Sequence, residues 1–536
     1  MNSPEDNIEL ELKLLAADPA AMEALPGVLE EVWGEVRDLG EVEFHDRYLD
    51  TDDWRLYRAG FGCRLRSAGE GEMLTVKAVA DMQRGWASRA EFEEWLGSPA
   101  AEIPGPMPGG EIAERFSPAL AGKPLEVKVE LVKRHRAYEV ADGDVRGKAT
   151  ADLVRVGTHE FAEVEIELVE GDQAAFVERA ERMRDRLGLR PSDKDKYARA
   201  LELAGVEPPS LPDGPETKLQ PGDRLVDAAH KVMRVHFARL FWNEPGARLG
   251  LDPEALHDMR VASRRLIAAL GVFRDALPAR RDESFERGLK WLAKNLGAAR
   301  DMDIAVERFD LEAEALPEPD RRALQPYREH LLRERDKARA RMLSTLDSKR
   351  YAHLVEQLRK FLDAGPPRRS SAPKSAEPVA EAAPRLLLPS VRKLRKKGRA
   401  LSPESPDEAL HKYRRQCKRV RYMAEFFSDL YGKPALRLAK RIVAMQDALG
   451  EHQDALVASQ TLAEFIHRRP SPRWATRELY VALGRVMEQR SRLAEVSRKD
   501  FFKARKTFDR KKTVKPIKKR MKKAAPPPEE GTAEGV

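Results

Sequence analysis

The chain has 536 residues, with 97 Lys and Arg against 89 Asp and Glu, 42% hydrophobic residues and 2 cysteines. At about 100–200 residues per domain this length requires more than one hydrophobic core, and the apolar content excludes disorder throughout. Two cysteines exclude a disulfide framework and a cysteine metal site. The acidic start and the lack of an apolar run of about 18 residues exclude a signal peptide and a membrane span, so we expect a cytoplasmic protein that does not enter a membrane.

Charge is distributed unevenly along the chain. Residues 1–200 contain 27 Lys and Arg against 42 Asp and Glu, a net charge of −15, whereas the rest of the chain has a net charge of +23. This asymmetry predicts two modules with different partners, the second of which attracts a polyanion.

Proline-rich and glycine-rich stretches mark the expected domain boundaries. Residues 204–222 and 364–389 are predicted linkers. They delimit a first domain at 1–203 and a second at 223–510, whose halves are 223–363 and 390–510. The segment from Arg505 to Lys523 has 11 basic residues in 19, so residues 511–536 are predicted to form a basic, disordered tail.

The first domain is predicted to be rich in strands. Residues 8–14, IELELKL, alternate between apolar and charged, which is the period of a β-strand. Similar alternations occur at 41–50, 61–67, 73–80, 89–95, 125–132 and 161–169, with helical patterns at 19–37 and 172–188. Many strands with few helices predict an α+β domain built on an antiparallel sheet or barrel.

Charged side chains repeat with a period of two on many of these strands. The clusters are Glu9-x-Glu11-x-Lys13, Arg64-x-Arg66, Lys77, Arg89-x-Glu91-x-Glu93, Arg134-x-Arg136, Glu163-x-Glu165-x-Glu167 and Lys194-x-Lys196. A single such strand indicates a solvated outer face, but seven clusters favour a shared interior site. Converging carboxylates would hold Mg²⁺ or Mn²⁺, and facing cations would bind phosphate oxygens, as phosphoryl transfer requires.

The pattern Glu9-x-Glu11-x-Lys13 resembles the ExExK signature of the CYTH family, the triphosphate tunnel metalloenzymes. The resemblance covers about residues 1–203 and implies an eight-stranded antiparallel tunnel, open at both ends, that binds a triphosphate and divalent metal. The sequence departs from the family where a tunnel arginine is usual, because His135 stands there. Arg134 and Arg136 therefore remain alternative candidates.

The resemblance also implies roles for individual residues. The implied metal ligands are Glu9, Glu11, Glu91, Glu93, Asp152, Glu165 and Glu167. The implied phosphate-binding residues are Arg64, Arg66, Lys77, Arg89, Arg134 or Arg136, Lys194 and Lys196. Lys13, with Glu9 and Glu11, is placed at the catalytic centre beside the attacked phosphorus.

The second domain is predicted to be helical and internally repeated. Residues 255–273 match 409–427 with an offset of 154, and residues 296–306 match 449–459 with an offset of 153. Each repeat carries a basic helical face, formed by His257, Arg260, Arg264 and Arg265 in the first and by His411, Arg414, Lys418 and Arg419 in the second. Two solvated amphipathic helices are the alternative, but equivalent clusters favour one composite anion-binding surface.

These segments resemble the CHAD domain, which often follows CYTH in one chain. The characteristic parts are His257-Asp-Met-Arg260, Arg264-Arg265, Arg300-Asp301-x-Asp303 and the His411 repeat. The resemblance implies a pseudo-two-fold helical bundle that binds inorganic polyphosphate, and hence a possible place at polyphosphate granules. We expect Asp301 and its counterpart Asp454 to cap helices or orient basic residues.

The leading hypothesis is a Mg²⁺- or Mn²⁺-dependent hydrolase of inorganic triphosphate with an attached polyphosphate-binding domain. Alternatives within the same tunnel are a class IV adenylyl cyclase-like or thiamine triphosphatase-like activity. A non-catalytic polyphosphate scaffold is a third hypothesis. Nucleic acid is expected only as a non-specific partner, because no helix for base recognition is recognisable.

Overall fold

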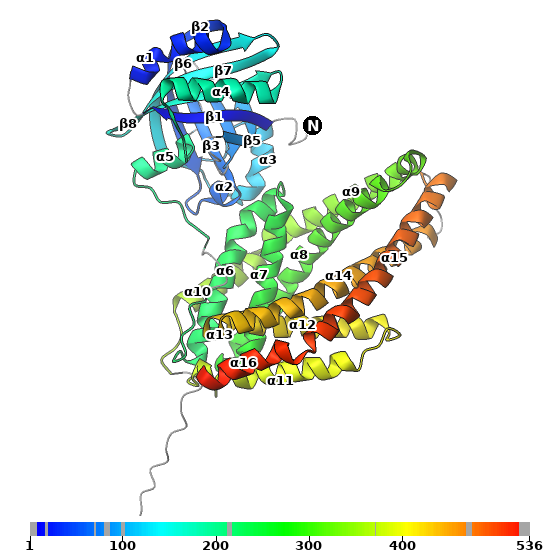
Figure 1. Ribbon diagram of the computed structural model, residues 1–536. Helices are drawn as coiled ribbons and strands as arrows, with labels where there is room; N and C mark the ends of the chain where they lie inside the picture. Colours follow the sequence, from blue (N-terminus) through cyan, green and yellow to red (C-terminus); the bar gives the residue numbers. More distant parts are fainter. Residues whose placement is uncertain are drawn as a thin grey trace, which may run out of the picture. The chain divides into compact units, whose positions relative to one another are not determined.

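The computed structural model describes residues 8–16, 20–68, 71–79, 86–97, 102–211, 217–369, 371–467 and 474–524. The chain divides into two compact units (Figure 1). The first comprises Met1–Ser210 with Asn243–Ala255, and the second Leu211–Trp242 with Leu256–Val536.

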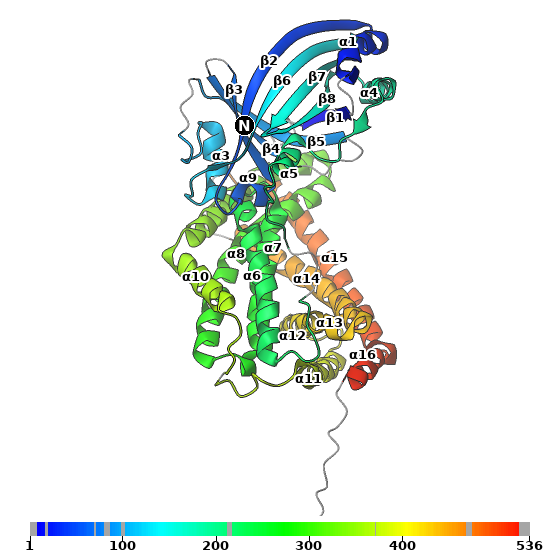
Figure 2. The same cartoon turned by 90° about the vertical axis from the view of Figure 1, so that its left-hand side faces the viewer.

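The first unit is a closed ring of antiparallel strands. Its strands are β1 (Ile8–Ala16), β2 (Glu35–Asp50), β3 (Phe61–Ala68), β4 (Gly71–Ala78), β5 (Trp86–Trp95), β6 (Glu126–Asp142), β7 (Val145–Val156), β8 (His159–Glu170) and β9 (Arg190–Pro191). The order is β5-β4-β3-β2-β6-β7-β8-β1, and β1 also pairs with β5, which closes the ring. Figure 2 shows β2, β6, β7 and β8 running side by side. The predicted eight-stranded antiparallel fold is confirmed, with the short β9 added against β1 as a ninth strand.

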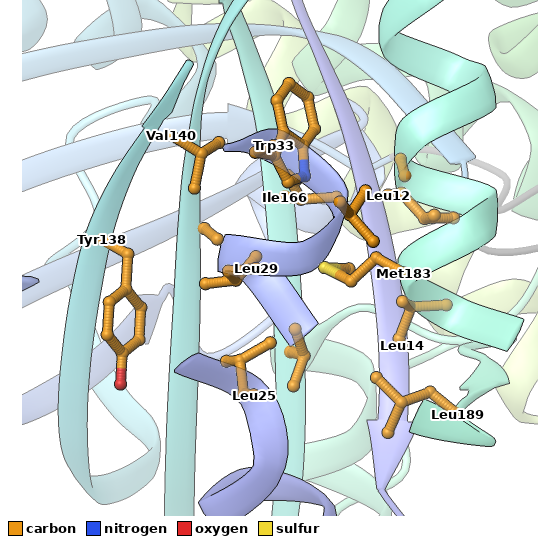
Figure 3. Packing of buried hydrophobic residues seen from close by; sticks show 14 of the residues in the cluster. Leu12, Leu14, Leu25, Leu29, Trp33, Tyr138, Val140, Ile166, Met183 and Leu189 are labelled. Carbon is orange, nitrogen blue, oxygen red and sulfur yellow. The ribbon is translucent and has the colours of Figure 1, made fainter. Parts of the chain in front are cut away.

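Helices cover the outer face of the ring. They are α1 (Ala20–Trp33), α2 (Arg55–Arg58), α3 (Glu111–Leu120) and α4 (Gln173–Leu187). A further helix, α5 (Lys196–Leu203), instead faces the interior of the ring with Lys196 and Tyr197. Leu12 and Leu14 of β1 point outward and pack with Leu29 and Trp33 of α1 and Met183 of α4 (Figure 3). Because successive residues of a strand face opposite sides, this packing turns Glu11 and Lys13 into the ring.

Apolar side chains fill the interior of the ring near α5. Val129 and Leu131 of β6 face inward here, and they pack in one buried cluster with Tyr197 and Leu201 of α5. The resemblance implied a tunnel open at both ends, but this cluster occupies one end. The charged part of the interior is therefore a cavity with an apolar floor.

The second unit is helical. Its helices are α6 (Leu225–Leu249), which continues into the first unit, α7 (Pro253–Val272), α8 (Ala279–Glu314), α9 (Glu318–Leu346), α10 (Lys349–Asp363), α11 (Val379–Arg399), α12 (Asp407–Phe426), α13 (Ser428–Tyr431), α14 (Lys433–His467), α15 (Arg477–Phe508) and α16 (Lys511–Ala524). Phe309 of α8, Tyr327 of α9, Phe465 of α14 and Leu483 of α15 belong to one core cluster. The four long helices thus pack together. In the part of the chain that the structure describes, no helix is long and apolar enough to cross a membrane.

The helix pattern follows the sequence repeat. The matching segments 255–273 and 409–427 lie mainly on α7 and α12, each of 20 residues. The segments 296–306 and 449–459 lie on α8 and α14, of 36 and 35 residues. Equivalent motifs therefore occupy equivalent places in helices of matching length.

Two sequence predictions about irregular segments are wrong. The expected linker at 364–389 contains the first half of α11, which begins at Val379. The expected disordered tail begins with α16, in which Val514, Ile517 and Met521 are buried. These three side chains share one helical face, so burying them stabilises a helix despite its many lysines. Residues 525–536 lie outside the described residues.

Candidate functional site

The ring encloses a cavity of about 430 Å³ lined mainly by charged side chains. The cationic lining residues are Lys13, Arg64, Arg66, Lys77, Lys133, Lys148 and Lys196, joined by His135. The anionic lining residues are Glu11, Glu91, Glu93, Glu165, Glu167 and Asp195. All eight strands β1–β8 and the start of α5 contribute to the lining, so the closed ring is what brings these side chains together.

Carboxylates gather where β1, β5 and β8 are neighbours. Glu11 is 5% exposed, and its oxygens lie 3.0 Å from Lys13 Nζ and 3.7 Å from Lys77 Nζ. Lys77 also forms an ion pair with Glu91. Burial, followed by the nearby carboxylate of Glu11, raises the pKa of Glu167. Crowded carboxylates of this kind favour the binding of a cation.

Two arginines face the cavity from β3 and are held by Asp46 of β2. Asp46 is fully buried and accepts hydrogen bonds from Arg66 Nε at 2.7 Å and Nη2 at 2.9 Å, with Arg64 Nη1 at 4.0 Å. Burial alone would raise the pKa of Asp46, but the two guanidinium groups lower it on balance. Asp46 therefore stays ionised and fixes both arginines before any anion binds.

Strand β6 contributes a lysine and a histidine that share one carboxylate. Asp152 of β7 is fully buried, accepts a hydrogen bond from Lys133 Nζ at 3.1 Å and lies 2.5 Å from His135 Nδ1. Burial lowers the pKa of Lys133 to about 8, although Asp152 opposes this shift. Asp152 thus orients two groups that face the cavity.

Lys196 lies at the centre of a buried ion-pair network. Its Nζ is 2.9 Å from Asp152, 2.7 Å from Glu163 and 2.6 Å from Glu165. Burial opposes the charge of Lys196, but these carboxylates raise its pKa well above the ordinary value. Glu165 also pairs with Lys13, so the network links α5 to β1 and β8.

We expect the substitution Lys196→Met to lower the free energy of unfolding by about 3–5 kcal/mol, because it leaves three buried carboxylates without their shared cation. Urea denaturation at neutral pH would measure this loss. Lys194→Met is the matched control, because Lys194 pairs with the exposed Glu202 and its loss should cost less than about 1 kcal/mol. Equal losses in the two variants would contradict the network.

Most residues predicted for the site line the same cavity. The structure brings together Glu11, Lys13, Arg64, Arg66, Lys77, Glu91, Glu93, Glu165, Glu167 and Lys196. The side chains of Glu9 and Arg89 lie outside the described part, although their backbones pair between β1 and β5. Lys194 does not line the cavity; its Nζ donates to Glu202 at 2.9 Å.

Three predicted site residues are placed elsewhere by the structure. Arg134 and Arg136 are exposed on the outer face of β6, where Arg136 pairs with Asp38. The inward positions of this strand belong to Lys133 and His135, so neither arginine lines the cavity. Asp152 was predicted as a metal ligand, but it lies behind the cavity wall. Its oxygens are engaged there by Lys133, His135 and Lys196.

Several cavity residues were not among the residues predicted for the site. They are Tyr48, Thr75, Lys133, His135, Lys148, Thr150, Asp195 and Tyr197. Lys148 and Thr150 precede Asp152 at intervals of two, so extending the alternation back along β7 would have found them. Lys133 and His135 alternate along β6 with the arginines that were considered, Arg134 and Arg136.

The carboxylates that line the cavity on β1, β5 and β8 fit a divalent cation. Glu11, Glu91 and Glu167 offer the oxygen ligands that Mg²⁺ and Mn²⁺ prefer, and burial, followed by the charge of Glu11, raises the pKa of Glu167. Lysines already contact two of these carboxylates. Among the described residues no three His, Cys, Asp or Glu side chains are gathered as a ready ligand set. A cation would therefore have to displace the lysine contacts.

The second unit contains a cationic cluster formed by Arg260 and Arg264 of α7 with Arg414 and Lys418 of α12. Burial, followed by Arg414, Arg264 and Arg260, lowers the pKa of Lys418 to about 7, and Asp454 opposes this shift. The four side chains from both repeats are therefore close enough to repel one another. This mutual repulsion would be relieved by an anion.

A glycine accommodates an arginine in each repeat. A Cβ at Gly450 of α14 would lie 2.7 Å from Arg414 Nη2, and a Cβ at Gly297 of α8 would lie 3.6 Å from Arg260 Nε. The pairs are equivalent in the repeat, since each offset is 153 or 154 residues. Asp301 also accepts a hydrogen bond from Arg260 Nη2 at 3.0 Å, which agrees with its expected orienting role.

The other basic residues predicted for this surface are distributed around the cluster. Arg265 pairs with Glu425 at 2.8 Å and lies over the Tyr422 ring, so it braces α7 against α12. Arg419 is exposed and lines a groove of about 540 Å³ that Arg264 and Lys418 also line. His257 and His411 are half-buried, one turn before Arg260 and Arg414.

The protein thus has two domains. The first is a closed antiparallel ring with a charged interior, and the second is a helical unit with an internal repeat. The CYTH domain profile matches residues 7–201, and the CHAD domain profile matches residues 231–463. The chain is a CYTH–CHAD protein.

Two relatives match this chain over most of their own length and most of its length. Two uncharacterized proteins from strains of Mycobacterium tuberculosis are each 24% identical over 489 residues, which covers 86% of this chain and 89% of theirs. Among solved structures, the CHAD domain from Ricinus communis is 27% identical over 51% of this chain and 89% of its own, with a TM-score of 0.42. HpAC1 from Hippeastrum, described as having a dominant triphosphatase activity, is 17% identical over 38% of this chain and 98% of its own, with a TM-score of 0.28.

Proposed function

We propose that the CYTH domain hydrolyses inorganic triphosphate with the help of Mg²⁺ or Mn²⁺, and that the CHAD domain binds inorganic polyphosphate. The observation that carries the first part is a single cavity in which seven Lys and Arg side chains face six Asp and Glu side chains. The cations suit phosphate oxygens and the carboxylates suit metal ions, so one cavity offers both halves of a metal–phosphate complex.

The charge balance of the cavity supports a cation as co-ligand. Its lining is close to neutral, and three more carboxylates, Asp46, Asp152 and Glu163, are buried behind it. A bare triphosphate carries several negative charges, which this interior does not offset alone. Divalent cations bound together with the anion would supply the missing positive charge.

The side chains divide into roles by position. Arg64, Arg66, Lys133 and Lys196 bind phosphate oxygens, and Lys13 faces the attacked phosphorus between Glu11 and Glu165. Glu11, Glu91 and Glu167 would hold the divalent cation, which supplies charge neutralisation and lowers the pKa of bound water. Glu165 and Asp152 keep the lysines in place.

The aromatic lining favours an inorganic substrate over a nucleotide or thiamine triphosphate. Among the described lining residues, Tyr48 and Tyr197 are the only ones with a phenyl-type ring. They stack on each other at 4.7 Å with an interplanar angle of 13°, so one face of each ring is taken and cannot stack on a base. Cyclase-like and thiamine triphosphatase-like activities remain the alternative within this cavity.

Phosphate release from a substrate panel tests the proposal. The panel comprises inorganic triphosphate, pyrophosphate, ATP, thiamine triphosphate and long polyphosphate, each with Mg²⁺, Mn²⁺ or a chelator. We expect triphosphate to be the best substrate and the chelator to abolish its hydrolysis. Cyclic AMP as the main product from ATP would support the cyclase alternative instead, and no turnover of any substrate would favour a non-catalytic scaffold.

Binding of polyphosphate by the CHAD domain should depend on pH through Lys418. Since the pKa of Lys418 is lowered to about 7, this side chain loses its charge as the pH rises through about 7. We expect affinity for long polyphosphate to fall over that range, and the variant Lys418→Arg, which stays charged, to lose this dependence. Titration calorimetry at several pH values would measure both. An identical pH profile for the two proteins would contradict a role for Lys418.

A further inference from the structure

A second basic pocket lies in the CHAD domain, away from the cationic cluster and between α14, α15 and α16. It has a volume of about 210 Å³ and is lined by Pro434, Arg437, Arg441, Thr507, Arg510, Lys512, Thr513 and Pro516. Arg437 and Arg441 are one turn apart on α14, and Arg510 and Lys512 come from the junction of α15 and α16. Four cations from separate segments thus surround one small hollow.

Among the residues that the structure describes, no carboxylate lines this pocket. The nearest in sequence is Asp509, between Thr507 and Arg510, and it is used elsewhere. Its side chain accepts a hydrogen bond from Arg395 Nε at 3.1 Å and pairs with Arg399 at 3.5 Å. The carboxylate that could have neutralised the pocket is therefore held toward α11.

The four cations have no ion-pair partner among the described residues. Many other exposed basic side chains of the CHAD domain do have one, such as Arg328 with Asp310 and Arg385 with Glu377. Cations that surround a small hollow without counter-charge repel one another, and a bound anion would relieve that repulsion.

Neutral groups in the pocket also suit an anion. The first turn of α16, with Lys512 and Thr513, forms one side of it, and a helix N-terminus carries partial positive charge. The opposing carbonyl at the end of α15 is already satisfied, because Thr507 O accepts from Thr513 Oγ1 at 3.2 Å. That carbonyl is thus turned to a protein donor rather than left to repel a ligand.

The apolar face of α16 fixes this arrangement. Val514, Ile517 and Met521 are at most 4% exposed, and α16 packs against α11, α13 and α14. The part of the basic segment from Lys512 to Met521 is consequently a docked helix with defined side-chain positions. A docked helix can build a specific site, whereas a flexible tail would only condense counter-ions.

We propose that this pocket, defined by Arg437, Arg441, Arg510 and Lys512, binds a compact phosphate anion. The ligand is orthophosphate, pyrophosphate or the end of a polyphosphate chain, which share the same tetrahedral, multiply charged group. The volume suits such a group and is half that of the CYTH cavity. Arginine is the residue best matched to this geometry, because its guanidinium group presents several N–H donors in a fixed plane.

Hydrogen exchange of the full chain, read by mass spectrometry, provides a local test. We expect orthophosphate or pyrophosphate to slow exchange in peptides from 507–521, because the anion bridges α14 to the start of α16. The double variant Arg437→Ala/Arg441→Ala should lose this protection. These two exposed side chains are not needed to dock α16, so exchange of α16 without ligand should stay as in the wild type. Lys515→Ala/Lys519→Ala is the matched control, because it removes equal charge from α16 outside the pocket lining.

The outcomes separate the sources of the phosphate group. Protection by orthophosphate or pyrophosphate indicates a free anion, and protection by long polyphosphate alone indicates a chain end. Equal loss of protection in the two double variants would mean unspecific attraction to α16 and would overturn the proposal, as would no protection by any of the three probes. Because the readout is confined to 507–521, it does not depend on catalysis in the CYTH cavity or on binding at the cationic cluster.

Discussion

Replacing Glu11 with glutamine is expected to reduce metal-dependent hydrolysis of triphosphate by about 100-fold or more while the ring stays folded. Glu11 is the carboxylate that meets both Lys13 and Lys77, and its charge adds to the effect of burial in raising the pKa of Glu167. Its loss removes an oxygen ligand from the proposed metal site and changes the position of Lys13. Steady-state phosphate release over a range of Mg²⁺ and Mn²⁺ concentrations would measure the effect.

Stability and a matched glutamate provide the controls for this experiment. Without metal, Glu11→Gln also removes one of several crowded carboxylates, so the pKa of Glu167 should move toward its ordinary value. Glu139→Gln changes an exposed residue near the end of β6 that pairs with Arg37 and does not line the cavity, so it should leave hydrolysis unchanged. If Glu11→Gln kept near-normal turnover at saturating metal, the metal-site assignment would be wrong.

The CYTH fold could largely be predicted from alternation along its strands, but the direction of one strand's side chains could not. β6 carries charges on both faces, and a period of two does not say which face is inward. Tyr138 and Val140 pack in the outer core, and they share their face with Arg134 and Arg136. The inward face therefore belongs to Lys133 and His135. If Tyr138 had been assigned to the outer face that packs in the core, the alternation would have placed Lys133 and His135 on the inward face.

In the CHAD domain the repeat could be recognised from sequence, but the contacts it creates could not. Arg260 and Lys418 are 158 residues apart, and only packing of α7 near α12 makes them neighbours. Likewise, Gly297 and Gly450 leave room for Arg260 and Arg414 only because the helices that carry these arginines pack beside them. The error at α16 has another cause, because a high content of lysine concealed the buried positions of its apolar face.

We expect replacement of the whole cationic cluster, Arg260, Arg264, Arg414 and Lys418, by alanine to weaken binding of long polyphosphate by more than about 100-fold at low salt. The variant should not lose stability, because the four cations repel one another and lower the pKa of Lys418. Thermal unfolding without ligand would check this point before affinity is compared.

The salt dependence of binding distinguishes a defined site from general attraction. If each cluster residue neutralises one phosphate of a flexible chain, the slope of log affinity against log salt should fall by about 3 in the quadruple variant. The control replaces Arg322, Arg333, Lys337 and Lys360, four cations of α9 and α10 that each pair with a glutamate of their own helix. It removes the same charge from the same domain, so electrostatic attraction at a distance is matched. A diffuse basic surface would give both variants the same loss of affinity and slope. A composite site between the two repeats confines the loss to the cluster variant, because only those four side chains converge on one place.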